Sequence, residues 1–189
     1  YYADAVGDWH ETDWYEVDYD NPHRAGAGTW YYYASSSSNL LQGSTQLLEW
    51  DGVRFDRDGS SEALEGPDCW NHHVVGHSVS PAPGSDPYPY VAKRWVSPVG
   101  DTVQIRGRIQ KLADGGDGVE FWIHHNGSNL FHGVTGPSGE VPFFIGDVPV
   151  SDGDAIAVVL GPNGGVSYDR SLIDVRIESA RVRSMGALS

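Results

Sequence analysis

Several features are scarce or missing in this chain of 189 residues. Its single cysteine, Cys69, cannot form an internal disulfide, and because no nucleophile motif surrounds it, we interpret it as a buried, unreactive thiol. No apolar run reaches about 18 residues, so no membrane-spanning segment is predicted. The sequence also lacks a P-loop, a dinucleotide-binding motif and a Gly-x-Ser-x-Gly motif, which excludes the enzyme classes that depend on them.

Basic residues are few as well. The chain has 12 Lys and Arg residues against 26 Asp and Glu residues, which gives a formal net charge of −14 at pH 7. A surface this acidic repels phosphate backbones, so nucleic acid is not expected as a partner. The same charge suits a well-solvated extracellular protein. The first residues, 1–4, are typical of a processed or excised start.

The chain is rich, by contrast, in strands with period-two alternation. Apolar and polar residues alternate over 103–110 and 119–124, which is the pattern of strands that bury one face. A Gly-rich turn at 114–118 and the dipeptide Asn126-Gly127, which is well suited to a type I′ hairpin, separate these strands. Strands are predicted at 28–33, 91–96, 102–110, 119–125, 129–134, 141–146, 155–160 and 173–178, with a hairpin over 47–55.

No helix pattern of any length is present, so we expect an all-β fold, an antiparallel β-sandwich of jelly-roll type. Residues 56–68 and 78–89 are predicted loops. We divide the chain into an acidic, aromatic N-terminal segment (1–23), a β-sandwich domain (24–180) and a C-terminal tail (181–189). The apolar faces predict a core made of Val103, Ile105, Ile109, Val119, Phe121, Ile123, Ile156, Val158, Ile173, Val175 and Ile177.

The N-terminal segment is unusual for an acidic tail because aromatic residues are interleaved with its acids. Residues 1–22 contain seven acids and no Lys or Arg, together with two tryptophans and four tyrosines. A plain solvated tail would hold fewer rings. We therefore expect this segment to dock on the main domain or on a neighbouring chain, and the second possibility predicts self-association.

Histidines and acidic loops raise the question of a metal. Zinc needs three or four converging ligands, and neighbouring strand residues point to opposite faces, so we favour surface or hydrogen-bonded roles for the histidines and expect no zinc. Calcium fits better, because acidic loops supply hard oxygen ligands, although Asp-Gly pairs are also ordinary turn residues. The histidine groups are His72, His73 and His77, and His124, His125 and His132; the expected structural calcium ligands are Asp114, Asp117 and Asp169.

Trp122 lies on the polar side of its predicted strand. The preceding strand has Gln, Arg and Arg on its own polar side, so if the two strands pair, the indole lies beside guanidinium and amide groups on one exposed face. A flat ring next to planar hydrogen-bonding groups suits a sugar. The alternative is that a loop or the N-terminal segment covers the ring. The predicted ligand-binding residues are Trp122, Arg106, Arg108, Gln104, Glu120 and His124.

A family resemblance rests on several short motifs. Trp-Tyr-Tyr at 30–32 precedes Arg-Trp-Val-Ser-Pro at 94–98, which is followed by Gly-Asp-Gly-Val at 116–119, Asn-Gly at 126–127 and Gly-Asp at 153–154. Over roughly residues 24–178 this pattern resembles a β-sandwich module of large secreted bacterial proteins that is similar to carbohydrate-binding modules. The resemblance implies a secreted protein with a polysaccharide or glycan as partner. The module usually has a small or basic residue where Trp122 stands.

These observations favour a non-catalytic, extracellular, carbohydrate-binding module. A structural or adhesive subunit that uses its N-terminal segment for contacts is an alternative. A polysaccharide lyase or hydrolase is a second alternative, for which the sequence contains the ingredients without showing that they converge. Those ingredients are Tyr31 to Tyr33, His77, Arg94, Glu120 and His124.

Overall fold

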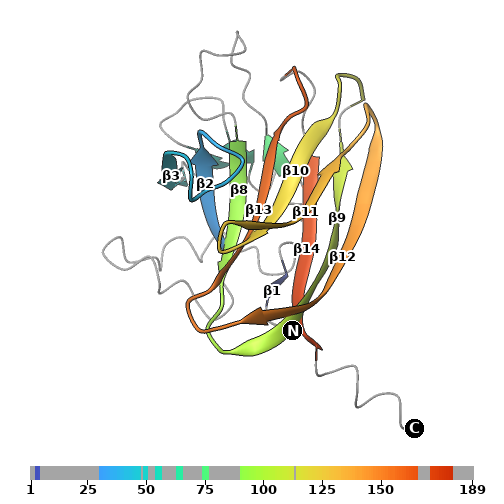
Figure 1. Ribbon diagram of the computed structural model, residues 1–189. Helices are drawn as coiled ribbons and strands as arrows, with labels where there is room; N and C mark the ends of the chain where they lie inside the picture. Colours follow the sequence, from blue (N-terminus) through green and yellow to red (C-terminus); the bar gives the residue numbers. More distant parts are fainter. Residues whose placement is uncertain are drawn as a thin grey trace, which may run out of the picture.

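The computed structural model describes residues 3–4, 30–47, 49–50, 54–56, 63–65, 74–76, 90–112, 114–165 and 171–180. In these ranges the chain forms two antiparallel β-sheets that pack face to face (Figure 1). The described ranges contain no α-helix, and none of them could cross a membrane as a helix. The predicted all-β sandwich is therefore confirmed.

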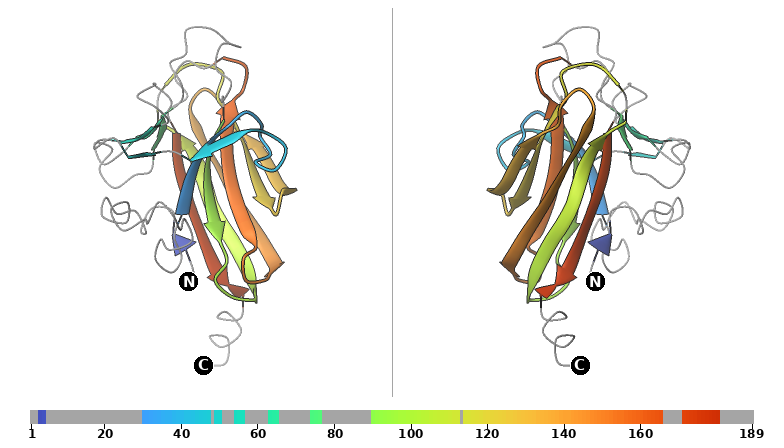
Figure 2. Two further views of the ribbon diagram at one scale, coloured as in Figure 1. Left: turned by 90° about the vertical axis from the view of Figure 1, so that its left-hand side faces the viewer. Right: turned by 90° about the vertical axis from the view of Figure 1, so that its right-hand side faces the viewer.

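One sheet has six strands in the order β11-β10-β13-β8-β2-β3. Its central strands correspond closely to predicted ones, because each carries a clear apolar face. The loop that follows β2 runs back across the outer surface of this sheet (Figure 2, left). The bounds are β2 Trp30–Ser35, β3 Thr45–Leu47, β8 Tyr90–Val96, β10 Val119–His125, β11 Ser128–Val134 and β13 Ala155–Pro162.

The other sheet has eight strands in the order β12-β9-β14-β7-β6-β5-β4, with β1 paired to β14 beside this path. Three long strands at one end carry the packing face, and short strands follow. The bounds are β1 Ala3–Asp4, β4 Glu49–Trp50, β5 Arg54–Asp56, β6 Ala63–Glu65, β7 Val74–Gly76, β9 Asp101–Lys111, β12 Gly139–Val150 and β14 Ser171–Ser179.

The sequence patterns predicted only some of the short strands. The hairpin expected over 47–55 is present as the antiparallel pair β4–β5. The loop expected over 56–68 is interrupted by β6, and β1, β3 and β7 were not predicted at all. Strands of two or three residues are too short to show a period, so their position comes from the sheet that they extend. The loop predicted over 78–89 lies outside the described residues.

The predicted turns have the expected backbone conformations. Asn126 and Gly127 both have positive φ angles, of 49° and 78°, and join β10 to β11 as the two-residue turn that this dipeptide favours. Positive φ angles also occur at glycines of the predicted turns at 114–118 and 152–153. A substitution at Gly127 would be strained by its φ angle and would also bring a Cβ to 2.6 Å from Leu41 Cδ1.

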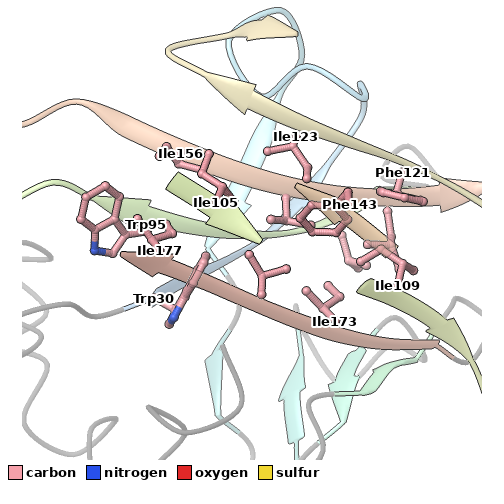
Figure 3. Packing of buried hydrophobic residues seen from close by; sticks show 14 of the residues in the cluster. Trp30, Trp95, Ile105, Ile109, Phe121, Ile123, Phe143, Ile156, Ile173 and Ile177 are labelled. Atoms are coloured by element: carbon pink, nitrogen blue, oxygen red, sulfur yellow. The ribbon is translucent and has the colours of Figure 1, made fainter. Parts of the chain in front are cut away.

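The space between the sheets is filled by one apolar cluster (Figure 3). All 11 residues predicted for the core are buried, with at most 1% of their surface exposed. Phe121 stacks on Phe131 with ring centroids 5.7 Å apart and also contacts Phe143 at 6.0 Å. Trp30 and Trp95 occupy the other end of the cluster, and the sequence patterns did not assign them to it.

Only part of the N-terminal segment is described. Ala3 pairs with Ile177 and Asp4 with Arg176, so these two residues extend the eight-stranded sheet of their own chain. This pairing agrees with docking on the main domain for residues 3–4. The rings of the segment 1–23 and the tail 181–189 lie outside the described residues.

Candidate binding site on the six-stranded sheet

The structure separates the predicted ligand-binding residues onto two faces. Strands β9 and β10 follow each other in the chain but belong to different sheets, so the expected pairing between them is wrong. Residues 112–118 connect the two layers, which lie about 10 Å apart in a sandwich. Sequence spacing cannot distinguish such a crossing from a hairpin. The predicted residues therefore lie on the outer surfaces of different sheets. Gln104, Arg106 and Arg108 belong to the eight-stranded sheet, and Glu120, Trp122 and His124 belong to the six-stranded sheet.

The outer surface of β9, β12 and β14 carries matched charges, and we call it the ion-pair face. Arg106 Nη2 lies 2.5 Å from Glu178 Oε1, and Arg108 Nη1 lies 2.9 Å from Glu140 Oε2. Arg108 Nε is also 3.3 Å from Asp174 Oδ2. Since both guanidinium groups already have carboxylate partners, they are less available to bind a polar ligand. The face consists of Gln104, Arg106, Arg108, Glu140, Phe144, Asp174 and Glu178.

The outer surface of the six-stranded sheet, which we call the aromatic face, is organised around Trp122. His132 lies opposite Trp122 on β11, and the two rings stack with centroids 5.1 Å apart and planes inclined by 15°. Tyr90 meets the indole edge-to-face at 5.8 Å. Tyr90 fits there because Gly161 has no side chain; a Cβ at 161 would lie 2.4 Å from the tyrosine ring. Side chains of the same sheet thus cover much of Trp122. The face consists of Tyr31, Tyr33, Tyr90, Arg94, Glu120, Trp122, His124 and His132.

Small residues form the floor of the aromatic face. Ala92, Ala157 and Val159 make a second buried cluster, against which Trp122 and Leu40 pack. Leu40 belongs to the loop 36–44, which connects β2 to β3. Asn39 fastens this loop to the β10–β11 turn, because its Nδ2 donates a hydrogen bond of 2.8 Å to the carbonyl oxygen of Gly127. Only tertiary contacts, 88 positions apart in sequence, bring the loop over the sheet.

A cavity of about 80 Å³ lies between this loop and the floor. It exists because Ala157 separates two long side chains: Arg94 and His124 are its direct neighbours on β8 and β10. Their Cα atoms are two strand spacings, or about 10 Å, apart, so both side chains can face the same space. The lining residues are Asn39, Leu40, Leu41, Arg94, His124, Asn126, Gly127, Ala155 and Ala157.

His124 is the most unusual group of the cavity. Only 5% of its surface is exposed, and its Nδ1 is buried without a hydrogen-bond partner. Burial lowers the pKa of His124 below its usual value of 6.5, so the ring is neutral at pH 7. A buried nitrogen of this kind is destabilising unless a ligand or water satisfies it. Tyr31 lies opposite Arg94 on β2, the strand next to β8. Burial raises the pKa of the Tyr31 phenol.

The histidines that were considered for zinc do not converge in the described part of the chain. His125 Nε2 lies 3.3 Å from Asp154 Oδ2, and His132 stacks on Trp122. Among the described residues, no group of three or more His, Cys, Asp or Glu is placed to hold a metal ion. His72, His73 and His77 lie outside the described residues, as does Cys69.

The acidic loops show how Asp117 is used. Its Oδ2 accepts a hydrogen bond of 2.7 Å from the backbone N–H of Gly165, and its carbonyl oxygen accepts another of 2.9 Å from Asn163 Nδ2. Asp117 thus ties two loops together, as the turn interpretation of these residues suggests. Asp114 is exposed nearby, whereas Asp169 lies outside the described residues. A structural calcium at these loops stays a prediction.

No protein-family model and no curated protein matches the chain. Among solved structures, it is similar to TmCBM61 in complex with beta-1,4-galactotriose, with 14% identity and a TM-score of 0.38 over 80% of this chain and 88% of that chain. It is also similar to CBM51 from Clostridium perfringens GH95 in complex with methyl-galactose, with 12% identity and a TM-score of 0.33 over 46% of this chain and 68% of that chain. The expected structural resemblance to carbohydrate-binding modules is thereby found.

Proposed function

We propose that this chain is a non-catalytic, secreted module that binds a glycan along the aromatic face. The observation that carries the proposal is the cavity on the same face as Trp122, where the side chains of Arg94 and His124 lie above a small apolar floor. On the ion-pair face, by contrast, both guanidinium groups already have carboxylate partners.

The chemistry of the aromatic face matches that of a sugar. A pyranose presents C–H groups on its faces and hydroxyl groups at its rim, and each hydroxyl both donates and accepts hydrogen bonds. Arg94 supplies donors, while the neutral imidazole of His124 can accept or donate according to its tautomer. Aromatic rings next to these groups supply the apolar contact. Sites that enclose a whole small molecule have volumes of roughly 300–1,000 Å³. A cavity of about 80 Å³ would hold one substituent of a sugar ring.

The test is a glycan array followed by calorimetry on two matched variants. Arg94→Gln removes the guanidinium of the cavity, whereas Arg106→Gln removes one from the ion-pair face. We expect Arg94→Gln to weaken binding about tenfold or more and Arg106→Gln to leave it unchanged, because hydrogen bonds to charged groups contribute roughly 1.5–3 kcal/mol. Equal loss in both variants would place binding elsewhere. Absence of binding to any glycan would contradict the proposal.

A lyase acting on an extracellular polysaccharide is the second candidate. It is favoured by the finding that two of its ingredients, Arg94 and His124, line one cavity, with Tyr31 across the strand pair from Arg94. A lyase uses a base and a group that neutralises the substrate carboxylate. Formation of an unsaturated sugar, followed by its ultraviolet absorbance during incubation with a uronate-containing polysaccharide, would favour this candidate over a binding module.

The adhesive alternative makes a different prediction about residues 1–22. If this segment joined neighbouring copies, its deletion would abolish self-association without affecting glycan binding. Because Ala3 and Asp4 already pair with β14 of their own chain, we expect the elution volume in size-exclusion chromatography to stay that of a monomer before and after the deletion. Assembly by the intact chain alone, with no glycan bound by either form, would favour the adhesive subunit.

A further inference from the structure

The cavity contains an arginine that has no carboxylate partner among the described residues. Arg94 makes no ion pair or hydrogen bond with any residue that the structure describes, although the chain has 26 acidic residues. On the ion-pair face, by contrast, Arg106 and Arg108 are both paired with carboxylates. The phenol of Tyr31 opposite Arg94 does not neutralise the guanidinium, since burial raises the phenol pKa. The positive charge of Arg94 is therefore available to a ligand.

No acidic side chain lines the cavity. The neighbouring carboxylate, that of Asp154, is already engaged: Oδ2 accepts 2.8 Å from the backbone N–H of Ser151, and Oδ1 accepts 2.8 Å from Asn126 Nδ2. His125 lies on the same carboxylate, 3.3 Å from Oδ2. These partners hold Asp154 at the turn. Among the described residues, the cavity thus combines a guanidinium group that has no ion pair with a lining that contains no acid, which locally favours a negative group.

The shape of the cavity limits the size of that group. The volume of about 80 Å³ is enough for a carboxylate with the carbon that bears it. Arg94 can bind a carboxylate with two parallel hydrogen bonds. His124 lines the cavity on the far side of Ala157, and its imidazole carries one N–H that can donate a third hydrogen bond in the tautomer that directs it into the cavity.

We propose that the cavity binds the carboxylate of a uronic acid residue, with Arg94 as the ion-pairing group and His124 as a hydrogen-bond donor. This inference rests on the proposed glycan binding and specifies its ligand class. The ring of the uronic acid lies outside the cavity towards Trp122, and the adjoining sugars continue along the aromatic face. The loop 36–44, fastened by Asn39, forms the wall that shields the ion pair from water.

The experiment compares the intact chain on matched pairs of oligosaccharides. Oligogalacturonate, oligoglucuronate and oligomannuronate are each tested beside the same oligosaccharide with its carboxyl groups reduced to alcohols. We expect at least one uronate to bind about ten- to hundredfold more tightly than its reduced form, which is the range for hydrogen bonds to charged groups. This preference should shrink as salt is raised, because part of the ion pair is screened.

Variants identify the side chain that binds the carboxylate. Arg94→Gln should abolish the preference for uronate, while Arg94→Lys, which keeps the charge but loses the two-pronged geometry, should retain part of it. His124→Asn should reduce it by a smaller factor, and Arg106→Gln should leave it intact. Thermal unfolding of each variant establishes that the fold is kept, which is expected because Arg94 lies on the outer face.

The outcomes separate the inference from the proposed function. Equal binding of uronates and their reduced forms, weakened by Arg94→Gln in both, would overturn the inference and leave glycan binding standing. A preference for uronate that survives Arg94→Gln would also overturn it. If no glycan binds at all, the proposed function fails and the inference fails with it. Cleavage of the uronate with formation of an unsaturated product would assign Arg94 and His124 to the lyase instead.

Discussion

The two outer faces of the sandwich are built by the same alternation and differ in how their polar groups are satisfied. On the ion-pair face, the guanidinium groups of Arg106 and Arg108 meet carboxylates of neighbouring strands. On the aromatic face, rings cover a floor of small residues, and the side chains of Arg94 and His124 line a cavity without an ion pair or hydrogen bond to any residue that the structure describes. A face whose polar groups are paired is complete by itself. A face with unpaired groups above a cavity has the features of a binding surface.

Small residues account for the difference. On the aromatic face Gly161 admits the ring of Tyr90, and Ala157 leaves room between Arg94 and His124. On the ion-pair face, long charged side chains fill the outer surface instead, because Arg108 of β9 reaches Glu140 of β12 and Asp174 of β14. The cavity therefore depends on the small side chain of Ala157 on β13 as well as on Arg94 of β8 and His124 of β10.

The largest expected effect concerns the interior that both faces share. Phe121→Ala should lower the free energy of unfolding by about 3–5 kcal/mol, because the ring is fully buried and its removal leaves a cavity. Phe144, which is 58% exposed on the ion-pair face, is the matched control. Phe144→Ala should cost less than about 0.5 kcal/mol. Urea unfolding measures both, and similar values for the two would mean that the inward and outward assignments are wrong.

Replacing Trp122 should have the next largest effect. Trp122 is partly buried between His132 and Tyr90, so Trp122→Ala should cost about 2 kcal/mol, less than the 3–5 kcal/mol of a fully buried ring. Trp122→Phe should recover much of this loss. Chemical unfolding checks both values. A cost near zero for Trp122→Ala would show that the ring is not covered by its own sheet, and would place it in the binding surface alone.

A smaller effect is expected from pH, and it distinguishes the cavity from the rest of the surface. Burial lowers the pKa of His124 in the folded state, so the unfolded chain binds a proton first as pH falls below 6.5. Stability from this residue is thus complete above pH 6.5 and declines as pH falls through the folded-state pKa. Unfolding free energies measured on both sides of pH 6.5 should show this slope.

Two variants define the source of the pH effect. His124→Asn should abolish the slope below pH 6.5, whereas His132→Asn, which changes an exposed ring on the same face, should leave it in place. The acidic side is separate: the backbone N–H of Ser151 and the amide of Asn126 lower the pKa of Asp154, whose contribution is lost only as pH falls below 3.8. A slope unchanged in His124→Asn would contradict the burial of this histidine.

Calcium should have the smallest effect. We expect an ion, where one binds, to use the loops that carry Asp114 and Asp117, with weak affinity because Asp117 already accepts the N–H of Gly165. Binding at a concentration equal to Kd would raise stability by only about 0.4 kcal/mol. Melting temperatures with calcium and with a chelator measure it. A large drop on chelation would instead indicate a site that includes residues outside those described.

Sequence patterns predicted the strands better than their partners. All the long strands and the 11 core residues were predicted from apolar patterns, and the alternation is clearest in β9 and β10, because a strand with one apolar face must bury that face. Alternation also placed Trp122 and His124 on an outward side of β10. It could not show which strand lies next to β10, because a connection of a few residues can turn within a sheet or cross to the opposite one. For this reason Arg106 and Arg108 were expected beside Trp122, and they lie on the other face.

The sequence by itself determined the class of fold, the position of the turns and the side of each long strand that faces inward, because these depend on neighbouring residues and their local conformations. The tertiary structure decided which outward-facing residues meet. Arg94, Ala157 and His124 are 30 to 63 positions apart and become neighbours only through the strand order β8-β13-β10. The loop of Asn39 then closes over them, so that a histidine on the outer face becomes buried. Burial and charge pairing depend on such long-range contacts, which no local pattern contains.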